Sequence, residues 1–403
     1  MRARAVSWAL CTAAVMAGAA CSNAPLSKEG PAPAVRASAP EPPPAVRVTL
    51  PKSPLSEDQQ ITHTLNRLSY GPRPGDVERV RQMGLGRWIE RQLEPGRISD
   101  DRVEAALQAF PTLTMPVPEL VRAYPEPDQK VLAKIRSGQM SQEEMRAMAP
   151  PEKRPFRIAA ELQAAKLTRA VLSERQLEEV MTDFWFNHFN VDARKGAVKW
   201  MIADYERTAI RPHALGKFRD LLLATAHHPA MLFYLDNWMS TKADFVPVAG
   251  PAKGRRLGLN ENYAREIMEL HTLGVDGGYT QEDVIEVARA FTGWTIDRPR
   301  EHGTFRFLPM AHDSGAKRVL GHALPAYGGE EDGVKVIDIL SRHPSTANFV
   351  ATKLARRFVS DEPPPALVER AAKTFRDTDG DIRRVVVTII TSPEFFSGEA
   401  YRA

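Results

Sequence analysis

The spacing of apolar residues limits what this chain can fold into more than any other feature, because it follows a helical period over most of the sequence after residue 55. Between Ser56 and Leu68, for example, Ile61 and Leu65 fall on one face of a predicted helix. Alternating patterns typical of half-buried strands are scarce, and the β-branched run Val387–Ile390 continues a helical pattern. We therefore predict a mainly α fold, a large multi-helix globular domain with long irregular loops.

Two helices joined by a glycine turn are predicted between Asn260 and Trp294, where polar and apolar signals are densest. Thr280 has the residue type and position of an N-cap for the second helix, with acidic residues after it. The ordinary interpretation of this pair is a helical hairpin of the core. The apolar arc of the first helix consists of Tyr263, Ala264, Ile267, Met268, Leu270 and His271.

The polar residues of the first helix restrict any metal site there. His271 lies inside the apolar arc, whereas Glu266 lies roughly 140° away from it at about 100° per residue. Glu269 is farther still. One metal ion therefore cannot bind His271 together with either glutamate, and a site must recruit side chains from other segments.

The N-terminus is predicted to be a lipoprotein signal peptide over residues 1–20. Arg2 and Arg4 precede an apolar run that is too short for a permanent membrane span, and small residues stand directly before Cys21. We expect lipid modification of Cys21, with palmitate among the attached acyl chains, which would hold the protein on the membrane. An ordinary secretory signal is the alternative. Both interpretations export the protein, and the residues after Cys21 favour the outer membrane, facing the periplasm or the cell surface.

Residues 21–54 are rich in proline and alanine and lack apolar periodicity, so they are predicted to form a disordered tether. The helical domain should then span residues 55–403, with a charged, proline-flanked segment at 125–155 that we expect to be a mobile insertion. The two cysteines, Cys11 and Cys21, both precede this domain, so it has neither a disulfide nor a thiolate metal site. Charges of both signs are interspersed and sum to +4, with no basic stripe for nucleic acid.

Side chains able to do chemistry occur in four segments. One of them is an aromatic run that places His188 between Asn187 and Asn190, and the alternative role for His188 is a core histidine satisfied by backbone groups. Another runs from His213 to Asn237, where we expect an acid and an amide to cap a helix or turn. The helix pair already described is the third segment.

The fourth segment holds His312, Asp313 and Lys317 within six loop positions. A histidine, a carboxylate and a lysine so close together, outside any helical period, suit a metal or acid–base site better than a core role. We therefore predict these three as the catalytic candidates. The metal-ligand candidates are His188, Glu266, His271, His312 and Asp313.

Several of these motifs carry a resemblance to a known family. They are Thr182–Val191, Ile210–Phe218 through Asn237, the stretch from Asn260 to Trp294, His312-Asp313 with Lys317 and Gly321, and His343–Ala347. Together they resemble the bacterial family called domain of unknown function 1800, over about Ile61 to Phe396. The resemblance implies a mainly helical, exported protein and carries over no catalytic residue or cofactor. Phe186 departs from the family pattern, because many members have a second histidine at this position. This difference argues against a two-histidine ligand set in this chain.

Two functional hypotheses follow. The favoured one is a non-catalytic envelope protein whose helical domain binds a partner protein or a polysaccharide, with the polar motifs serving as buried hydrogen-bond networks. The alternative is a metal-assisted hydrolase, in which His188, His312 and Asp313 converge with Glu266 or His271 around a divalent metal. In that hypothesis Lys317 orients an anionic group of the substrate.

Overall fold

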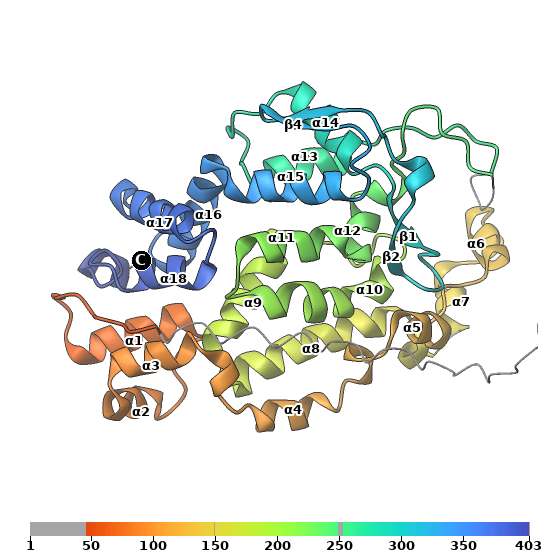
Figure 1. Ribbon diagram of the computed structural model, residues 1–403. Helices are drawn as coiled ribbons and strands as arrows, with labels where there is room; N and C mark the ends of the chain where they lie inside the picture. The colour runs from red at the N-terminus through yellow and green to blue at the C-terminus, as the bar shows by residue number, and fades with distance from the viewer. Residues whose placement is uncertain (1–45, 149, 249–252, 403) are drawn as a thin grey trace, which may run out of the picture. The chain divides into compact units, whose positions relative to one another are not determined.

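The structure, a computed structural model, describes residues 46–148, 150–248 and 253–402 of the 403-residue chain. The predicted signal peptide, Cys21 and most of the predicted tether lie outside the described residues. The predicted mainly α fold is confirmed, since the described part contains 19 α-helices and only four short strands (Figure 1). No helix in these ranges combines the length and the apolar character that crossing a bilayer requires.

The N-terminal part of the domain is a series of short helices. The predicted helix after Ser56 is confirmed, and Ser56 closes a capping box with Gln59. Gly75 and Gly84 have positive φ and separate the next helices from their neighbours. The helices are α1 (Glu57–Leu68), α2 (Asp76–Met83), α3 (Leu85–Gln92), α4 (Asp101–Leu107) and α5 (Val117–Ala123), with the 3₁₀ turns η1 (Pro95–Arg97) and η2 (Pro111–Leu113) between them.

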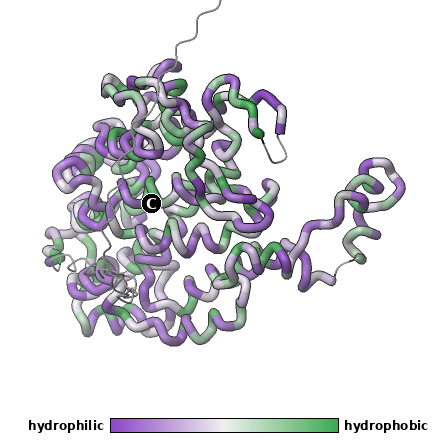
Figure 2. Tube along the Cα trace, turned by 45° about the vertical axis from the view of Figure 1, so that its right-hand side comes forward, coloured by the Kyte–Doolittle hydropathy of each residue, from purple (hydrophilic) through white to green (hydrophobic). Residues whose placement is uncertain are grey.

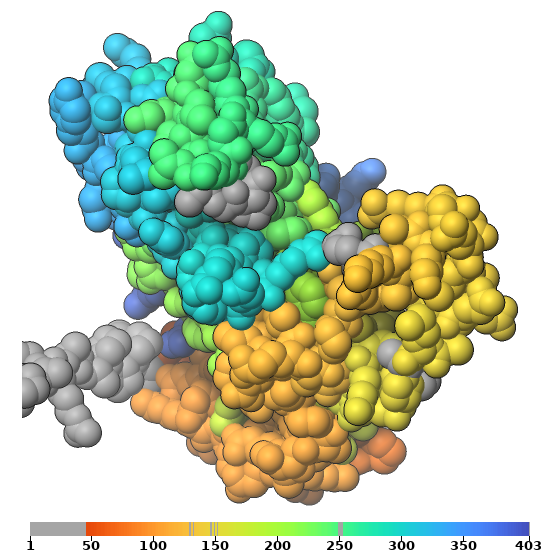
Figure 3. Space-filling view, turned by 90° about the vertical axis from the view of Figure 1, so that its right-hand side faces the viewer, coloured from red at the N-terminus to blue at the C-terminus, as the bar shows by residue number. Residues whose placement is uncertain are grey.

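The central part begins with two short helices inside the segment predicted as a mobile insertion. That mobility stays a prediction, but Figure 3 shows this gold-coloured part of the chain as a projecting lobe. The helices are α6 (Gln129–Arg136), α7 (Gln142–Ala147), α8 (Phe156–Leu172), α9 (Gln176–His188), α10 (Val198–Tyr205), α11 (Phe218–His227) and α12 (Pro229–Tyr234), with η3 (Pro151–Lys153) before α8.

A short turn that contains Ser173 separates α8 from α9, and Ser173 does not cap α9. The N-cap position is Arg175, and the Ser173 hydroxyl instead donates to Asp100 (2.7 Å) and accepts from the Arg175 amide (2.9 Å). A turn between α8 and α9 therefore uses the serine to fasten the start of α4.

The stretch from Asn260 to Trp294 forms the predicted helix pair, α13 (Asn262–Glu269) and α14 (Gln281–Ala290). Thr280 caps α14 by accepting from the Asp283 amide, as predicted. Leu270 was predicted to be buried but is 49% exposed, because α13 ends at Glu269 and the helical wheel no longer applies beyond it.

Two small hairpins were not anticipated from the sequence. β1 (Trp294–Asp297) pairs antiparallel with β2 (Thr304–Phe307), with Trp294 opposite Phe307, and β3 (Lys317–Val319) pairs with β4 (His322–Leu324). Strands of three or four residues are too short to show a clear alternation. The remaining helices are α15 (Glu331–Arg342), α16 (Pro344–Phe358), α17 (Pro365–Asp377), α18 (Ile382–Ile390) and α19 (Gly398–Arg402).

Helices of all these parts contribute to one hydrophobic core. Its largest fully buried side chains include Trp185, Trp200 and Trp294. Figure 2 shows hydrophobic and hydrophilic residues alternating along the helical traces, as expected where each helix buries one face. The core therefore joins the segments that carry the candidate site residues.

Candidate functional site

The loop with His312, Asp313 and Lys317 follows the β1–β2 hairpin and the 3₁₀ turn η7 (Pro309–Ala311). It passes close to Gly293, which has a φ of 80°, and a Cβ on Gly293 would lie 2.7 Å from the Leu308 carbonyl oxygen and 3.3 Å from the His312 Cβ. Glycine is therefore required at position 293 for this approach. The loop is thereby fixed against the end of α14.

Lys317 and Asp332 form a buried ion pair beside this loop. The Lys317 Nζ lies 2.8 Å from Asp332 Oδ2, and both side chains are 0% exposed. The same ammonium group donates to the carbonyl oxygens of Asp313 (2.5 Å) and Gly315 (2.9 Å). An ammonium has three N–H donors, and these three acceptors occupy all of them. Lys317 consequently has no donor left for the anionic group that the hydrolase hypothesis assigns to it.

His312 is also enclosed, with an exposed fraction of 4%. Its Nδ1 lies 2.8 Å from the Thr292 carbonyl oxygen, and its Nε2 lies 3.3 Å from Asp332 Oδ2. His312, Lys317 and Asp332 therefore form one buried network. The other carboxylate oxygen of Asp332 has no hydrogen-bond partner in the described chain.

Asp313 points to a different partner. Its two oxygens accept from the Arg289 guanidinium, Oδ2 from Nε (2.9 Å) and Oδ1 from Nη2 (3.1 Å), and Oδ1 also accepts from the Gly315 amide (2.9 Å). These bonds, chiefly those from Arg289, lower the pKa of the Asp313 carboxyl. The carboxylate is thus ionised and held in a two-pronged ion pair.

His188 and His271 meet in the core, with ring centroids 6.2 Å apart. The His188 Nε2 donates to the His271 carbonyl oxygen (3.0 Å), whereas its Nδ1 is buried without a partner in the described chain. Burial lowers the pKa of His188 well below its usual value and lowers that of His271 to about 3, with Lys353 adding to both shifts. Both imidazoles are therefore neutral at pH 7.

Glu266 is partly exposed on α13, and partial burial together with Glu269 raises its pKa. In the described ranges no group of three or more His, Cys, Asp or Glu side chains has an arrangement that could hold a metal ion. The structure thus brings His188 to His271 and His312 to Lys317, but it does not gather His188, His312 and Asp313 with Glu266 or His271. A metal-binding or catalytic role for them stays a prediction.

Asp332 and Arg289 are the members of these networks that the sequence analysis missed. Asp332 stands among acidic residues at the start of α15 and looks like an ordinary favourable charge there. Its position four residues before Val336, a member of the buried stripe, was the available signal. Arg289 gave no comparable sign, because it also pairs with Glu286 on the same helix.

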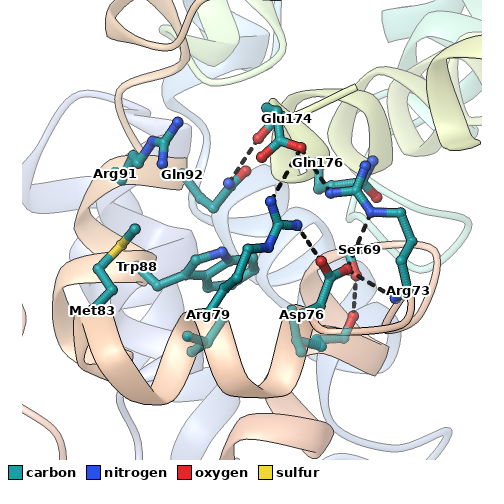
Figure 4. Close-up of a pocket in the computed structure, with 12 residues that line it drawn as sticks. Ser69, Arg73, Asp76, Arg79, Met83, Trp88, Arg91, Gln92, Glu174 and Gln176 are labelled. Atoms are coloured by element: carbon teal, nitrogen blue, oxygen red, sulfur yellow. Dashed lines mark hydrogen bonds and ion pairs between the residues drawn. The ribbon is translucent and has the colours of Figure 1, made fainter. Parts of the chain in front are cut away.

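A pocket of about 80 Å³ lies between α1, α2, α3 and the α8–α9 turn. Figure 4 shows Arg73 and Arg79 directed toward Asp76 and Glu174. Arg73 binds Asp76 (3.1 Å) and Glu174 (2.9 Å), and Arg79 also pairs with Asp76. The charged groups at the centre of the pocket are already matched, so we assign them to holding α2 against the α8–α9 turn.

A larger pocket, of about 270 Å³, lies between α4, η2, α8 and the end of α10. At its inner end Arg211 binds Glu179 through two bonds (2.7 and 2.9 Å) and Glu206 at 3.1 Å. Glu206 also has Arg169 at 3.6 Å and Lys166 at 3.8 Å. Arg169, Glu206 and Arg211 thus line one side of the pocket, and Glu179 and Lys166, which are not part of its lining, pair with them.

A model of a family of proteins of unknown function, DUF1800, matches residues 63–403. The chain belongs to this family. The match includes α9, α13, α14 and the loop with His312, so the resemblance stated from the sequence is confirmed. The DUF1800 description assigns no activity. No curated protein and no solved structure matched the chain significantly.

Proposed function

We propose that this member of the DUF1800 family is a non-catalytic binding protein of the cell envelope, tethered to the membrane by lipid on Cys21. The observation that carries the non-catalytic part is the Lys317 ammonium, whose three donors are all used by Asp332 and two loop carbonyls in a site closed to solvent. A group that binds or activates a substrate needs an open position.

The same reasoning applies to the other residues of the motif. Asp313 is held by Arg289, and His312 lies between the Thr292 carbonyl and Asp332. These contacts join α14, the loop and α15. The motif is thus a buried polar network that holds three segments together, and this structural role supports the non-catalytic proposal. The pocket of about 270 Å³ between α4 and α8 supports the binding part, because it is open and has both charged and apolar side chains on its wall.

The hydrolase alternative and the binding proposal differ in metal content. Elemental analysis of the purified full chain, in the wild type and in His188→Ala and His312→Ala, is the direct measurement. We expect no stoichiometric metal in any of the three. One equivalent of zinc or another divalent metal in the wild type, lost in either variant, would overturn the proposal in favour of the hydrolase.

The membrane tether has its own test. Cys21→Ser removes the thioether sulfur to which the lipid would be attached, and we expect the chain to leave the membrane fraction. Cys11→Ser, inside the predicted signal, is the matched control and should fractionate as the wild type. Unchanged membrane association of Cys21→Ser would refute the lipid anchor.

A further inference from the structure

Arg169 is the least committed of the three arginines on the wall of the pocket between α4 and α8, because Arg207 and Arg211 both form shorter ion pairs. It lies on α8, and its one ion pair in the described chain is with Glu206 at 3.6 Å, beyond hydrogen-bond distance. Its side chain is only 18% exposed. A guanidinium has five N–H donors, and a mostly buried one normally has them paired. Arg169 therefore lines the pocket with donors that no group of the described chain accepts.

The charges around Arg169 also favour the binding of an acceptor in the pocket. Burial and the neighbouring Arg211 lower its pKa, and they outweigh the nearby glutamates. Glu206 cannot compensate for this, because it is shared with Arg211 (3.1 Å) and with Lys166 (3.8 Å). A negative charge entering the pocket would offset the cost of holding Arg169 charged in this place.

The opposite wall of the pocket carries Leu107, Phe110, Pro111 and Leu113 together with the polar Glu104, Gln108 and Thr114. The Glu161 carboxylate on α8 accepts from the Thr112 amide (3.0 Å) and hydroxyl (2.7 Å), which holds η2 against α8. This bond positions Phe110 and Leu113 on the pocket wall, and Leu107 from α4 lies beside them. Most apolar side chains of the pocket thus lie on the side of α4 and η2, and most charged side chains lie on the other side.

The backbone at the inner end departs from a regular helix. α10 continues as a π-helical turn, η4 (Glu206–Ile210), followed by the 3₁₀ turn η5 (Arg211–His213). Pro212 has no amide hydrogen and cannot continue an α-helix, which accounts for the irregular ending. The wide turn brings both Glu206 and Arg211 to the pocket, and such π turns occur often at functional sites.

From this geometry we infer that the pocket binds a small organic carboxylate, with the anion on Arg169 and the body of the molecule against Phe110, Leu107 and Leu113. A volume of about 270 Å³ limits the ligand to a small molecule or to one residue of a longer chain. The carboxylate could belong to an apolar acid or to an acidic sugar. This inference rests on the proposed binding function and names the ligand class for it.

The test measures binding by calorimetry with the purified full chain. Benzoate represents the apolar acids and glucuronate the acidic sugars, while benzyl alcohol and glucose are their uncharged counterparts. We expect one of the two anions to bind at least about tenfold more tightly than its uncharged counterpart, as the loss of one charged hydrogen-bonded contact predicts. Which anion binds identifies the source. Binding of neither anion, or equal binding of the neutral molecules, overturns the inference.

Two variants locate the site. Arg169→Gln should weaken anion binding by at least about tenfold, whereas Arg219→Gln, which removes a partly exposed arginine paired with Asp338 on α15, should bind as the wild type. Leu107→Trp leaves Arg169 in place but fills the apolar side, and should also weaken binding. Circular dichroism verifies that each variant folds.

The outcomes of the variants are separable from the proposed function. Wild-type affinity in both Arg169→Gln and Leu107→Trp would overturn this site. If one of them does not fold, the other still decides. If the wild type binds neither anion while it contains no metal and depends on Cys21 for membrane association, only this ligand class is excluded. That combination of results would leave the proposed binding function intact.

Discussion

The hydroxyl of Thr292 is fully buried and joins the end of α14 to the loop with His312. It donates to the Arg289 carbonyl oxygen (2.6 Å) and accepts from the Asp313 amide (2.8 Å). One side chain thus satisfies two backbone groups, both of which belong to partly buried residues. Its role is to hold the motif in place, which is consistent with the structural interpretation of the neighbouring histidine and aspartate.

Thr292→Val should therefore lower the free energy of unfolding by about 1 kcal/mol, because the partly buried Asp313 amide would lose its acceptor. Urea unfolding of the variant and the wild type provides the measurement. Thr352→Val is the matched control, since the Thr352 hydroxyl bonds only a carbonyl of its own helix near the surface. A Thr292→Val variant as stable as this control would contradict the assigned role.

Interactions between residues close together in the chain were predicted well from the sequence. Thr280 caps its helix as expected, since a capping box involves residues only three positions apart. The partners of His312, Asp313 and Lys317 could not be predicted in this way. Asp332 reaches Lys317 from 15 positions away and Arg289 reaches Asp313 from 24, and nothing in a helical period indicates which side chains meet across such separations.

At the scale of elements, α15 packs against the β1 hairpin through a glycine inside the helix. A Cβ on Gly333 would lie 2.3 Å from Trp294 Cζ2 and 3.1 Å from Phe291 Cδ1, and both rings are fully buried. α15 can therefore approach this closely only with glycine at position 333. The same approach carries Asp332, the preceding residue, to Lys317.

Gly333→Ala should destabilise the protein by about 1–3 kcal/mol, because the added methyl group overpacks a rigid aromatic contact. An alanine inside a helix normally has the opposite effect, a gain of about 0.4–1 kcal/mol. Gly86→Ala in α3 is the control expected to show that gain or no change, since a Cβ there meets only the Val48 carbonyl oxygen at 3.7 Å. Chemical denaturation of both variants measures the difference. Equal effects would refute the packing argument.

The helices were predictable as elements, but their packing was not. Short hairpins such as β1–β2 depend on pairing rather than on local preference, and the contact between α15 and Trp294 depends on a glycine that reads as an unfavourable helix residue. The candidate segments could therefore be predicted from the sequence. That His188 and His312 lie in different buried clusters could not.

At the scale of the whole molecule, several buried histidines make stability depend on pH. Burial lowers the pKa of His63 and of His227 to about 4 and that of His271 to about 3, and it lowers that of His188. In the unfolded chain these groups titrate near 6.5. Between pH 6.5 and about 4 the unfolded chain binds more protons than the folded one. Stability is therefore fully present above pH 6.5 and falls as the pH drops through this window.

We expect the free energy of unfolding to fall by several kcal/mol between pH 7.5 and 5.5, since each such histidine contributes up to about 1.4 kcal/mol per pH unit below 6.5. Urea unfolding at the two pH values measures the change. In His271→Gln one titrating group is absent, so the change should be smaller by about 1 kcal/mol. The same pH dependence in the variant and the wild type would show that His271 is not held neutral by burial.

Lys317 and Asp332 serve the fold, and a double-mutant cycle measured by urea unfolding tests this role. Lys317→Met and Asp332→Leu each leave one buried charge unpaired, so each should cost about 3–5 kcal/mol. The double variant should lose much less than the sum of the two, because it buries no charge. Single variants as stable as the wild type, with no coupling between them, would show that the ion pair has no structural role.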